Sequence, residues 1–194
     1  LVFLTVPVTY IFLFFSEHTG WRHLYRGSPD GKMIVPVTSG EWEVRTLHAV
    51  DVDESYVILS GTKDSHIAEN VYRVSLKNPN DVARLTPEDA SHVGNVSEHG
   101  SYFVDSFSSI DQPAKIVVRN ASGRELRVLS EPVSVPYDRY TFGTVELRDV
   151  PMADCSTTKA IFVLPPNFDS GTRYPVWLRT YGGPHHPQVN NAWS

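Results

Sequence analysis

The sequence predicts a mainly β fold, and its composition and turn spacing are the reasons. Fourteen prolines and twelve glycines accompany many valine, isoleucine, tyrosine and phenylalanine residues, which favours short strands and turns over long helices. Hydrophobic residues make up 41% of the chain and charged residues 20%, as in a globular protein with a core. Strand-turn-strand patterns then follow one another from Leu1 to about Pro132.

The recurring unit in this part of the chain is a hairpin with a polar turn. Asp30-Gly31 between two apolar runs is a strong hairpin signal. Equivalent positions fall at Tyr25, Tyr72 and Lys115, a period of about 45 residues with further strand pairs between the hairpins. Four strands in such a period are typical of a β-propeller blade, and no Trp-Asp dipeptide marks the WD40 type.

The number of blades indicates whether such a propeller could close. About three blades fit before residue 135, whereas closed propellers contain about four to eight. Three blades would leave open sheet edges and exposed inner faces. We therefore expect further blades before Leu1.

The first fifteen residues are uncharged and mostly apolar, which raises the possibility of a membrane segment. A spanning helix needs about 20 apolar residues, and this run is shorter and is interrupted by Thr5, Pro7 and Thr9. It also has neither the basic start nor the small-residue cleavage site of a signal peptide. We expect two buried propeller strands here, with a membrane segment as the less favoured alternative.

Charge and cysteine content narrow the classes of function. The net charge of −5, with no run of five basic residues, gives no reason to expect a nucleic-acid partner. Cys155 is the only cysteine, so an internal disulfide or a zinc site with several cysteines is excluded. We expect Cys155 to be a buried structural residue rather than a reactive thiol.

The pattern changes after residue 132. A connector rich in proline and tyrosine precedes three longer apolar runs, which predict strands at 145–150, 159–164 and 176–180. The third strand should be buried and should stop at Gly182-Gly183-Pro184, because two glycines and a proline force a tight turn. Tyr181 would then lie at the end of a rigid strand, where site residues are often placed.

Three separated motifs carry a resemblance to a known family. They are FSEHTGWRHLY at 15–25, TSGEWEV at 38–44, and a run at 162–189 that contains LPPNFD and YPVWLRTYGGPHHPQV. In this order and spacing they resemble the prolyl oligopeptidase family of serine peptidases, and within it the dipeptidyl peptidase IV branch. The resemblance covers nearly the whole chain.

The resemblance implies two domains and one site residue. Residues 1–135 would be part of a β-propeller with about three blades, and residues 136–194 the N-terminal part of an α/β-hydrolase catalytic domain. Tyr181 matches the family tyrosine whose hydroxyl group donates to the oxyanion hole. The Ser, Asp and His of the family follow this tyrosine in the chain, so these 194 residues would be an inactive piece of the enzyme.

The activity implied by the resemblance is that of a serine exopeptidase that releases N-terminal Xaa-Pro or Xaa-Ala dipeptides from peptides. Two alternatives stay open, namely a non-catalytic binding protein of the same architecture and an oligopeptidase or acylaminoacyl peptidase of the same family. The implied partners are peptide substrates and, as a possibility, a second copy of the chain. No metal or organic cofactor is implied, and the compartment is left open.

Other residues that could carry chemistry have simpler interpretations. No G-x-S-x-G elbow occurs in the chain, so none of its serines is expected to be a nucleophile. His185 and His186 have no carboxylate close in sequence to complete a metal site, and we expect loop histidines near the rim of an active site. Trp21 and Trp42 are expected in the core of a blade.

Overall fold

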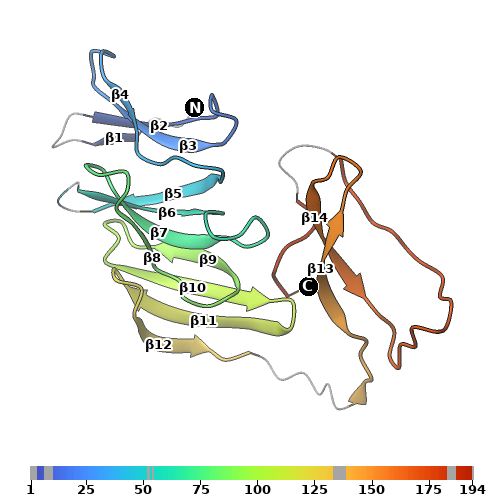
Figure 1. The fold of residues 1–194 in the computed structure, drawn as a ribbon. Helices are drawn as coiled ribbons and strands as arrows, with labels where there is room; N and C mark the ends of the chain where they lie inside the picture. The colour runs from blue at the N-terminus through green and yellow to red at the C-terminus, as the bar shows by residue number, and fades with distance from the viewer. Residues whose placement is uncertain are drawn as a thin grey trace.

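The computed structural model describes residues 4–6, 11–51, 53, 55–132, 139–182 and 187–193. Within these residues the chain consists of strands and loops without an α-helix, and strands β1 to β12 form three four-stranded antiparallel sheets. Figure 1 shows these three sheets stacked one on another. The prediction of a mainly β fold built from repeated four-stranded units is confirmed.

The first sheet pairs its strands in chain order: β1 (Leu4–Val6), β2 (Ile11–Ser16), β3 (His23–Gly27) and β4 (Ile34–Pro36). In the β3–β4 hairpin, Gly31 N donates a hydrogen bond to Ser28 O at 2.9 Å. Gly31 has a φ of 70°, a conformation that favours glycine. The hairpin predicted from Asp30-Gly31 is therefore confirmed.

Strands β1 and β2 occupy the apolar start of the chain. They pair antiparallel, with Leu4 opposite Leu13 and Val6 opposite Ile11. Leu13 is buried in the core, which confirms a strand here that packs inside the stacked sheets. The described residues contain no helix that is long and apolar enough to cross a membrane.

The second and third sheets repeat this arrangement. The second contains β5 (Val44–Val50), β6 (Tyr56–Gly61), β7 (Asn70–Ser75) and β8 (Val82–Arg84). The third contains β9 (Ser91–Val96), β10 (Tyr102–Ser109), β11 (Gln112–Asn120) and β12 (Glu125–Ser130). In both sheets each strand pairs with the next one along the chain, as four-stranded blades do.

The core lies between the sheets, and side-chain alternation along β6 explains its two halves. Val57 and Leu59 belong to the larger apolar cluster, which joins the first and second sheets. Ile58 points to the opposite face and belongs to a second cluster with Val71 and Phe103, which joins the second and third sheets. The second sheet is thus covered on both faces, so nearly all of β6 is buried.

The two tryptophans expected in the core have different surroundings. Trp42 is buried, and its indole Nε1 donates to Ser39 O at 2.7 Å, which confirms the expectation. Trp21 is only partly buried and stacks on His66 with ring centroids 5.9 Å apart. It lies in the connection that leads into β3, where fewer neighbours can surround it.

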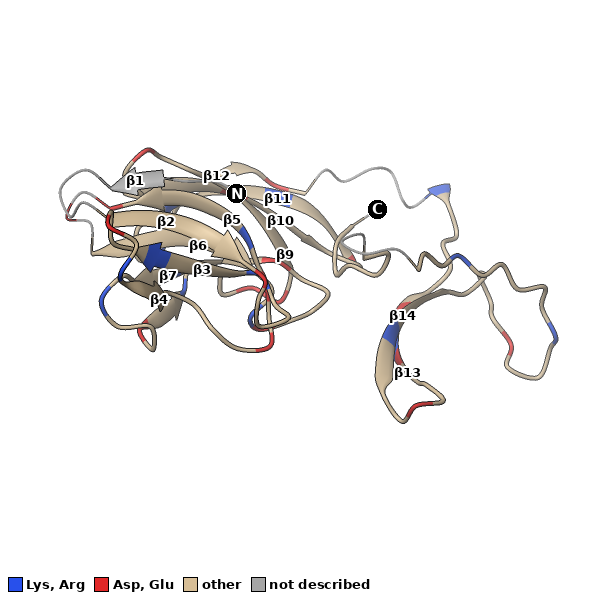
Figure 2. Cartoon of the chain, turned by 90° about the horizontal axis from the view of Figure 1, so that it is seen from above, with Lys and Arg blue, Asp and Glu red and all other residues tan. Residues whose placement is uncertain are grey.

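A separate hairpin follows the stacked sheets. It consists of β13 (Val145–Pro151) and β14 (Thr157–Val163), and in Figure 2 it projects to one side of the stack. Its turn holds Cys155 at a φ of 66°, with the thiol side chain exposed. The expectation of a buried Cys155 is therefore wrong, because the residue lies at a hairpin tip where few side chains can cover it.

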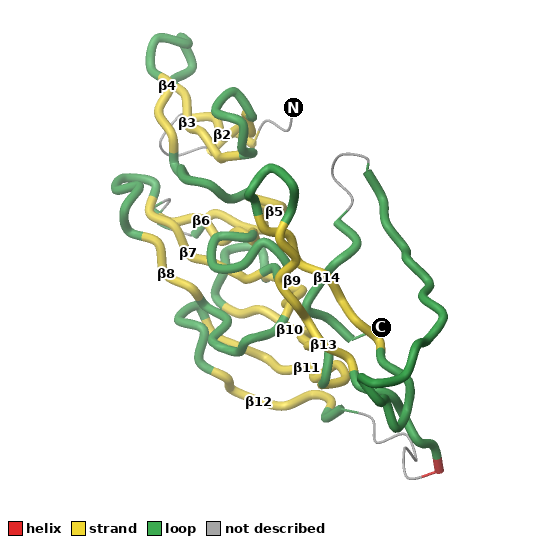
Figure 3. The backbone as a smooth tube through the Cα atoms, turned by 45° about the vertical axis from the view of Figure 1, so that its right-hand side comes forward, coloured by secondary structure: helices red, strands yellow, loops and turns green. Residues whose placement is uncertain are grey.

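The strand expected at 176–180 does not form. The backbone from 173 to 182 has no regular structure, and Val176, Trp177 and Leu178 are 89%, 93% and 82% exposed. Figure 3 shows this stretch as a long loop beyond β14. A strand requires a neighbour to accept its ladder hydrogen bonds, and no described strand lies beside this one.

Candidate functional site around Tyr181 and the end of the stacked sheets

Tyr181 lies at the end of the long loop, and 55% of its side chain is exposed. It therefore does not stand at the end of a buried strand, as the sequence suggested. Gly183 and Pro184 of the expected turn lie outside the described residues, and so do His185 and His186. More than half of the surface of Tyr181 is thus open to solvent in this chain.

The loop that leads to Tyr181 contains a hydrogen-bonded turn at Asp169. The Asp169 carboxylate accepts bonds from Gly171 N and from Thr172 Oγ1, each at 2.9 Å. These bonds, first the one from Gly171, lower the pKa of Asp169 below its usual value. Asp169 N also donates to the Tyr174 hydroxyl oxygen at 3.1 Å, so the turn has a defined shape although it is exposed.

The segment at 187–193 returns to the stacked sheets. Asn191 N donates to Ile67 O at 2.6 Å, and Ser91 N donates to Asn191 O at 3.1 Å. Further along, Trp193 N donates to Ser108 Oγ at 3.0 Å. The chain end in Figure 1 accordingly lies close to the ends of β10 and β11.

A cavity of about 650 Å³ lies between the third sheet and β13. Phe107, Ile110 and Leu147 supply apolar walls, while Glu88 and Lys115 supply charge. Asn191 also lines this cavity, so the returning segment closes part of it. Such a mixed apolar and charged space at the junction of two regions is a common setting for ligand sites.

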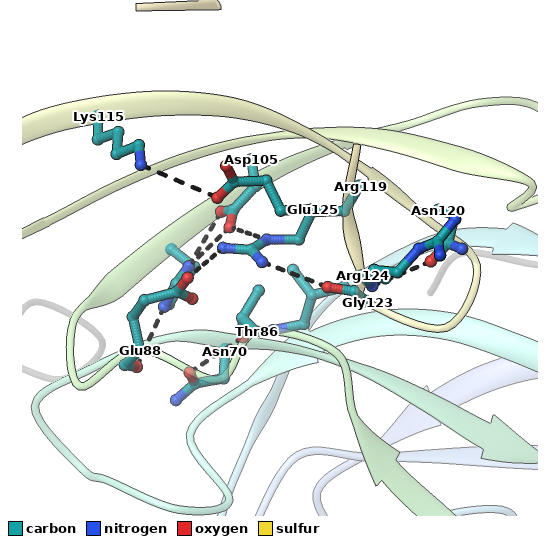
Figure 4. A network of polar contacts seen from close by, with 12 residues as sticks. Asn70, Thr86, Glu88, Asp105, Lys115, Arg119, Asn120, Gly123, Arg124 and Glu125 are labelled. Carbon is teal, nitrogen blue, oxygen red and sulfur yellow. Dashed lines mark hydrogen bonds and ion pairs between the residues drawn. The ribbon is translucent and has the colours of Figure 1, made fainter. Parts of the chain in front are cut away.

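Next to the cavity lies a buried charged network, shown in Figure 4. The guanidinium group of Arg119 on β11 donates from Nε to Asp105 Oδ2 at 2.8 Å and from Nη2 to Glu88 Oε1 at 2.6 Å. His92 Nδ1 lies 3.0 Å from Asp105 Oδ1. Arg119 also donates to the carbonyl oxygen of Gly123, at 3.2 Å. The network joins three strands to the β8–β9 connection.

These partners stabilise the charged form of Arg119. Burial alone would lower the pKa of Arg119, but its hydrogen bonds to Asp105 and Glu88 outweigh burial and raise the pKa above its usual value. Arg119 and Asp105 are 2% and 0% exposed. A fully charged pair in this setting depends on each partner to offset the desolvation of the other.

The same carboxylates and imidazole could be read as a metal site. The ligand atoms of Glu88, His92 and Asp105 lie within 4.8 Å of one another. Arg119 already places its positive charge between the two carboxylates. Both ring nitrogens of His92 also face oxygen atoms, Asp105 at Nδ1 and Glu88 O at Nε2. A cation would have to displace this network, so the residues fit a structural ion pair better than a metal centre.

The sequence patterns did not predict the charged network around Arg119 or the hydrogen bonds of Asn191. For the network, the alternation of side chains along the strands was a usable signal. Arg119 is two residues from the buried Val117, and Asp105 is two residues from the buried Phe103. Residues two apart in a strand share a face, so Arg119 and Asp105 point inward like these buried neighbours. Asn191 lies in a loop, where no such periodicity applies.

Comparison with known proteins gives a consistent result. The model of the dipeptidyl peptidase IV (DPP IV) N-terminal region matches residues 3–114. The dipeptidyl peptidase 4 of Trichophyton rubrum is 27% identical over 187 residues, and that of Arthroderma otae is 27% identical over 186 residues. Each alignment covers 92% of this chain and 24% of the relative. The chain therefore spans about a quarter of the length of the curated relatives that it matches.

A solved structure extends the similarity to three dimensions. The crystal structure of Porphyromonas gingivalis dipeptidyl peptidase 4 matches with a TM-score of 0.85 at 27% sequence identity. The match covers 95% of this chain and 26% of that chain. It therefore includes most of the region after the stacked sheets as well as the sheets themselves.

Proposed function

We propose that the whole protein is a serine exopeptidase, because this chain belongs to the family of the dipeptidyl peptidase IV N-terminal region. It releases N-terminal dipeptides with proline or alanine in second position. Residues 1–135 are blades of its β-propeller, and residues 136–194 begin its α/β-hydrolase domain. The observation that carries the proposal is the fold match to a dipeptidyl peptidase 4, which covers 95% of this chain.

Tyr181 supplies the oxyanion donor in this proposal. Attack of a serine on a peptide carbonyl gives a tetrahedral intermediate with a negatively charged oxygen. The tyrosine O–H group can donate a hydrogen bond to that oxygen. The Ser, His and Asp of the triad come from the part of the protein outside these 194 residues.

The stacked sheets have a different role in the proposal. They contain no nucleophile elbow, and their buried charges are engaged with one another. As blades of a propeller they would line the route to the catalytic serine and limit access to short peptides. Specificity for a free amino terminus would then depend on propeller groups outside this chain.

The test is hydrolysis of a Gly-Pro chromogenic amide by the full-length protein, with the substrate's amino terminus either free or blocked. We expect cleavage of the free form alone, and no cleavage of either form by the 194-residue chain. Cleavage of both forms would indicate an oligopeptidase instead. Cleavage of neither would indicate a non-catalytic binding protein, and activity of the 194-residue chain would overturn the assignment of the triad.

A further inference from the structure

Asn191 anchors the region that contains Tyr181, which is residues 139–182 and 187–193, on the stacked sheets. Among the described residues from 139 onward it is the only buried one, with 9% of its side chain surface exposed. Its backbone lies between two segments of the stack, bonded to Ile67 O on one side and to Ser91 N on the other. The region after residue 139 is thus fixed to the stack at a single buried position.

The side chain of Asn191 makes two further hydrogen bonds, and they need an amide. Its Oδ1 accepts from Ile110 N at 3.2 Å, and its Nδ2 donates to Asp89 O at 3.4 Å. One partner is a donor and the other is an acceptor, so the two bonds require a side chain that carries both functions. Aspartate could keep only the bond from Ile110, and alanine could keep neither.

The partners of Asn191 come from three different connections. Ile67 lies between β6 and β7, and Ile110 lies between β10 and β11. Asp89 lies between β8 and β9, and Ser91 is the first residue of β9. The second and third sheets also meet directly beside this point, where His92 N donates to Glu69 O at 2.8 Å. Asn191 is therefore held by a junction of two sheets rather than by one mobile loop.

We propose that Asn191 is a positioning residue, which fixes the segment that carries Tyr181 against the stacked sheets and so holds the tyrosine hydroxyl group at the reacting carbonyl. This inference rests on the proposed peptidase function. Asn191 is the first buried residue after Tyr181 in the described chain, so its attachment fixes the C-terminal end of the stretch that carries the tyrosine. Small misplacements of a catalytic donor can lower a rate by about 10²-fold.

The experiment uses the full-length protein with Asn191→Ala and its neighbour Asn190→Ala. Asn190 has the same side chain but is exposed, so it is a matched control. We expect Asn191→Ala to lower kcat by about 10- to 100-fold with KM changed by less than about threefold, and Asn190→Ala to change neither beyond about twofold. Asn191→Asp should give an intermediate loss, and it serves as the second variant if Asn191→Ala does not fold.

Coupling to Tyr181 distinguishes positioning from a general loss of structure. With Tyr181 already changed to Phe, Asn191→Ala should lower kcat by less than about threefold further, because the hydroxyl group that it positions is gone. A fully multiplicative loss in the double variant would overturn the proposal. So would a kcat of Asn191→Ala within about twofold of wild type.

Hydrogen exchange gives a readout that does not depend on activity. The backbone amides at positions 191 and 193, which donate to Ile67 O and Ser108 Oγ, should exchange faster in Asn191→Ala than in wild type and in Asn190→Ala. Unchanged exchange would overturn the positioning role whether or not the protein cleaves peptides. Faster exchange in a protein that cleaves no peptide would support the anchor and reject the peptidase function instead.

Discussion

At the level of single residues, Tyr181 carries the one chemical role that we assign inside this chain. Tyr181→Phe removes the hydroxyl group that we propose as a donor to the oxyanion. We expect kcat of the full-length protein on a Gly-Pro amide to fall by about 10² to 10³. The melting temperature should change little, because more than half of the tyrosine side chain is exposed.

Tyr102 offers a matched control for this substitution. It is also 55% exposed but lies on β10, in the third sheet. Tyr102→Phe should leave kcat unchanged, since its hydroxyl group has no part in the proposed reaction. A decrease of less than about threefold for Tyr181→Phe would contradict the oxyanion role.

The partial burial of His48 on β5 predicts that the free energy of unfolding depends on pH. Burial lowers the pKa of His48 below its usual value of about 6.5, and its Nε2 has no hydrogen-bond partner among the described residues. The unfolded chain therefore binds a proton more readily than the folded one. The contribution of neutral His48 to the free energy of unfolding is fully present above about pH 6.5 and decreases as the pH falls below that value.

The measurement is urea unfolding at several pH values between about 5 and 7.5 for wild type and His48→Leu. The difference in free energy of unfolding between the two proteins should shift in favour of His48→Leu as the pH falls. A difference that is constant over this range would show that His48 does not titrate with folding.

At the level of elements, the Arg119 network joins β9, β10 and β11 to the connection after β8. Arg119→Met would leave the Asp105 carboxylate buried without its cation. We expect the free energy of unfolding to fall by about 3 to 5 kcal/mol, the usual cost of breaking a buried pair. Urea unfolding followed by tryptophan fluorescence measures this change.

Two further variants distinguish the loss of the Arg119–Asp105 ion pair from general effects of substitution. Arg127→Met changes an exposed arginine on the neighbouring β12 and should cost less than about 0.5 kcal/mol. Arg119→Met combined with Asp105→Asn should recover part of the loss, because the unpaired charge is then absent. A cost below about 1 kcal/mol for Arg119→Met would mean that the network contributes little to stability.

The elements also show which parts of this structure could be predicted from the sequence. Short apolar runs bounded by turn residues identified strands such as β6, which is buried on both faces, and β11. The apolar run at 176–180 misled the same reasoning, since a strand needs a pairing neighbour that local sequence cannot supply. For Cys155 burial was expected from the residue type, but exposure depends on what packs over a hairpin tip, which the residue type does not determine.

At the level of the whole molecule, burial is uneven. The second sheet is covered on both faces, whereas the outer sheets keep exposed apolar side chains such as Ile34 and Val93. The loop after β14 adds Val176, Trp177 and Leu178, each more than four-fifths exposed. Exposed apolar patches and unpaired strand edges both promote association, so the 194-residue chain should not stay monomeric when concentrated.

Light scattering after size-exclusion chromatography tests this expectation. At about 100 μM the 194-residue chain should elute with a mass above the 21.8 kDa of one copy, and dilution should lower that mass. Trp177→Ser should reduce association most, because Trp177 is 93% exposed and offers the largest apolar surface of the loop, whereas Trp193→Ser, at 42% exposure, should reduce it less. Equal effects of the two substitutions would place the contact on the sheets rather than on the loop. A stable monomer at this concentration would mean that the exposed apolar surface is too dispersed to hold two copies together.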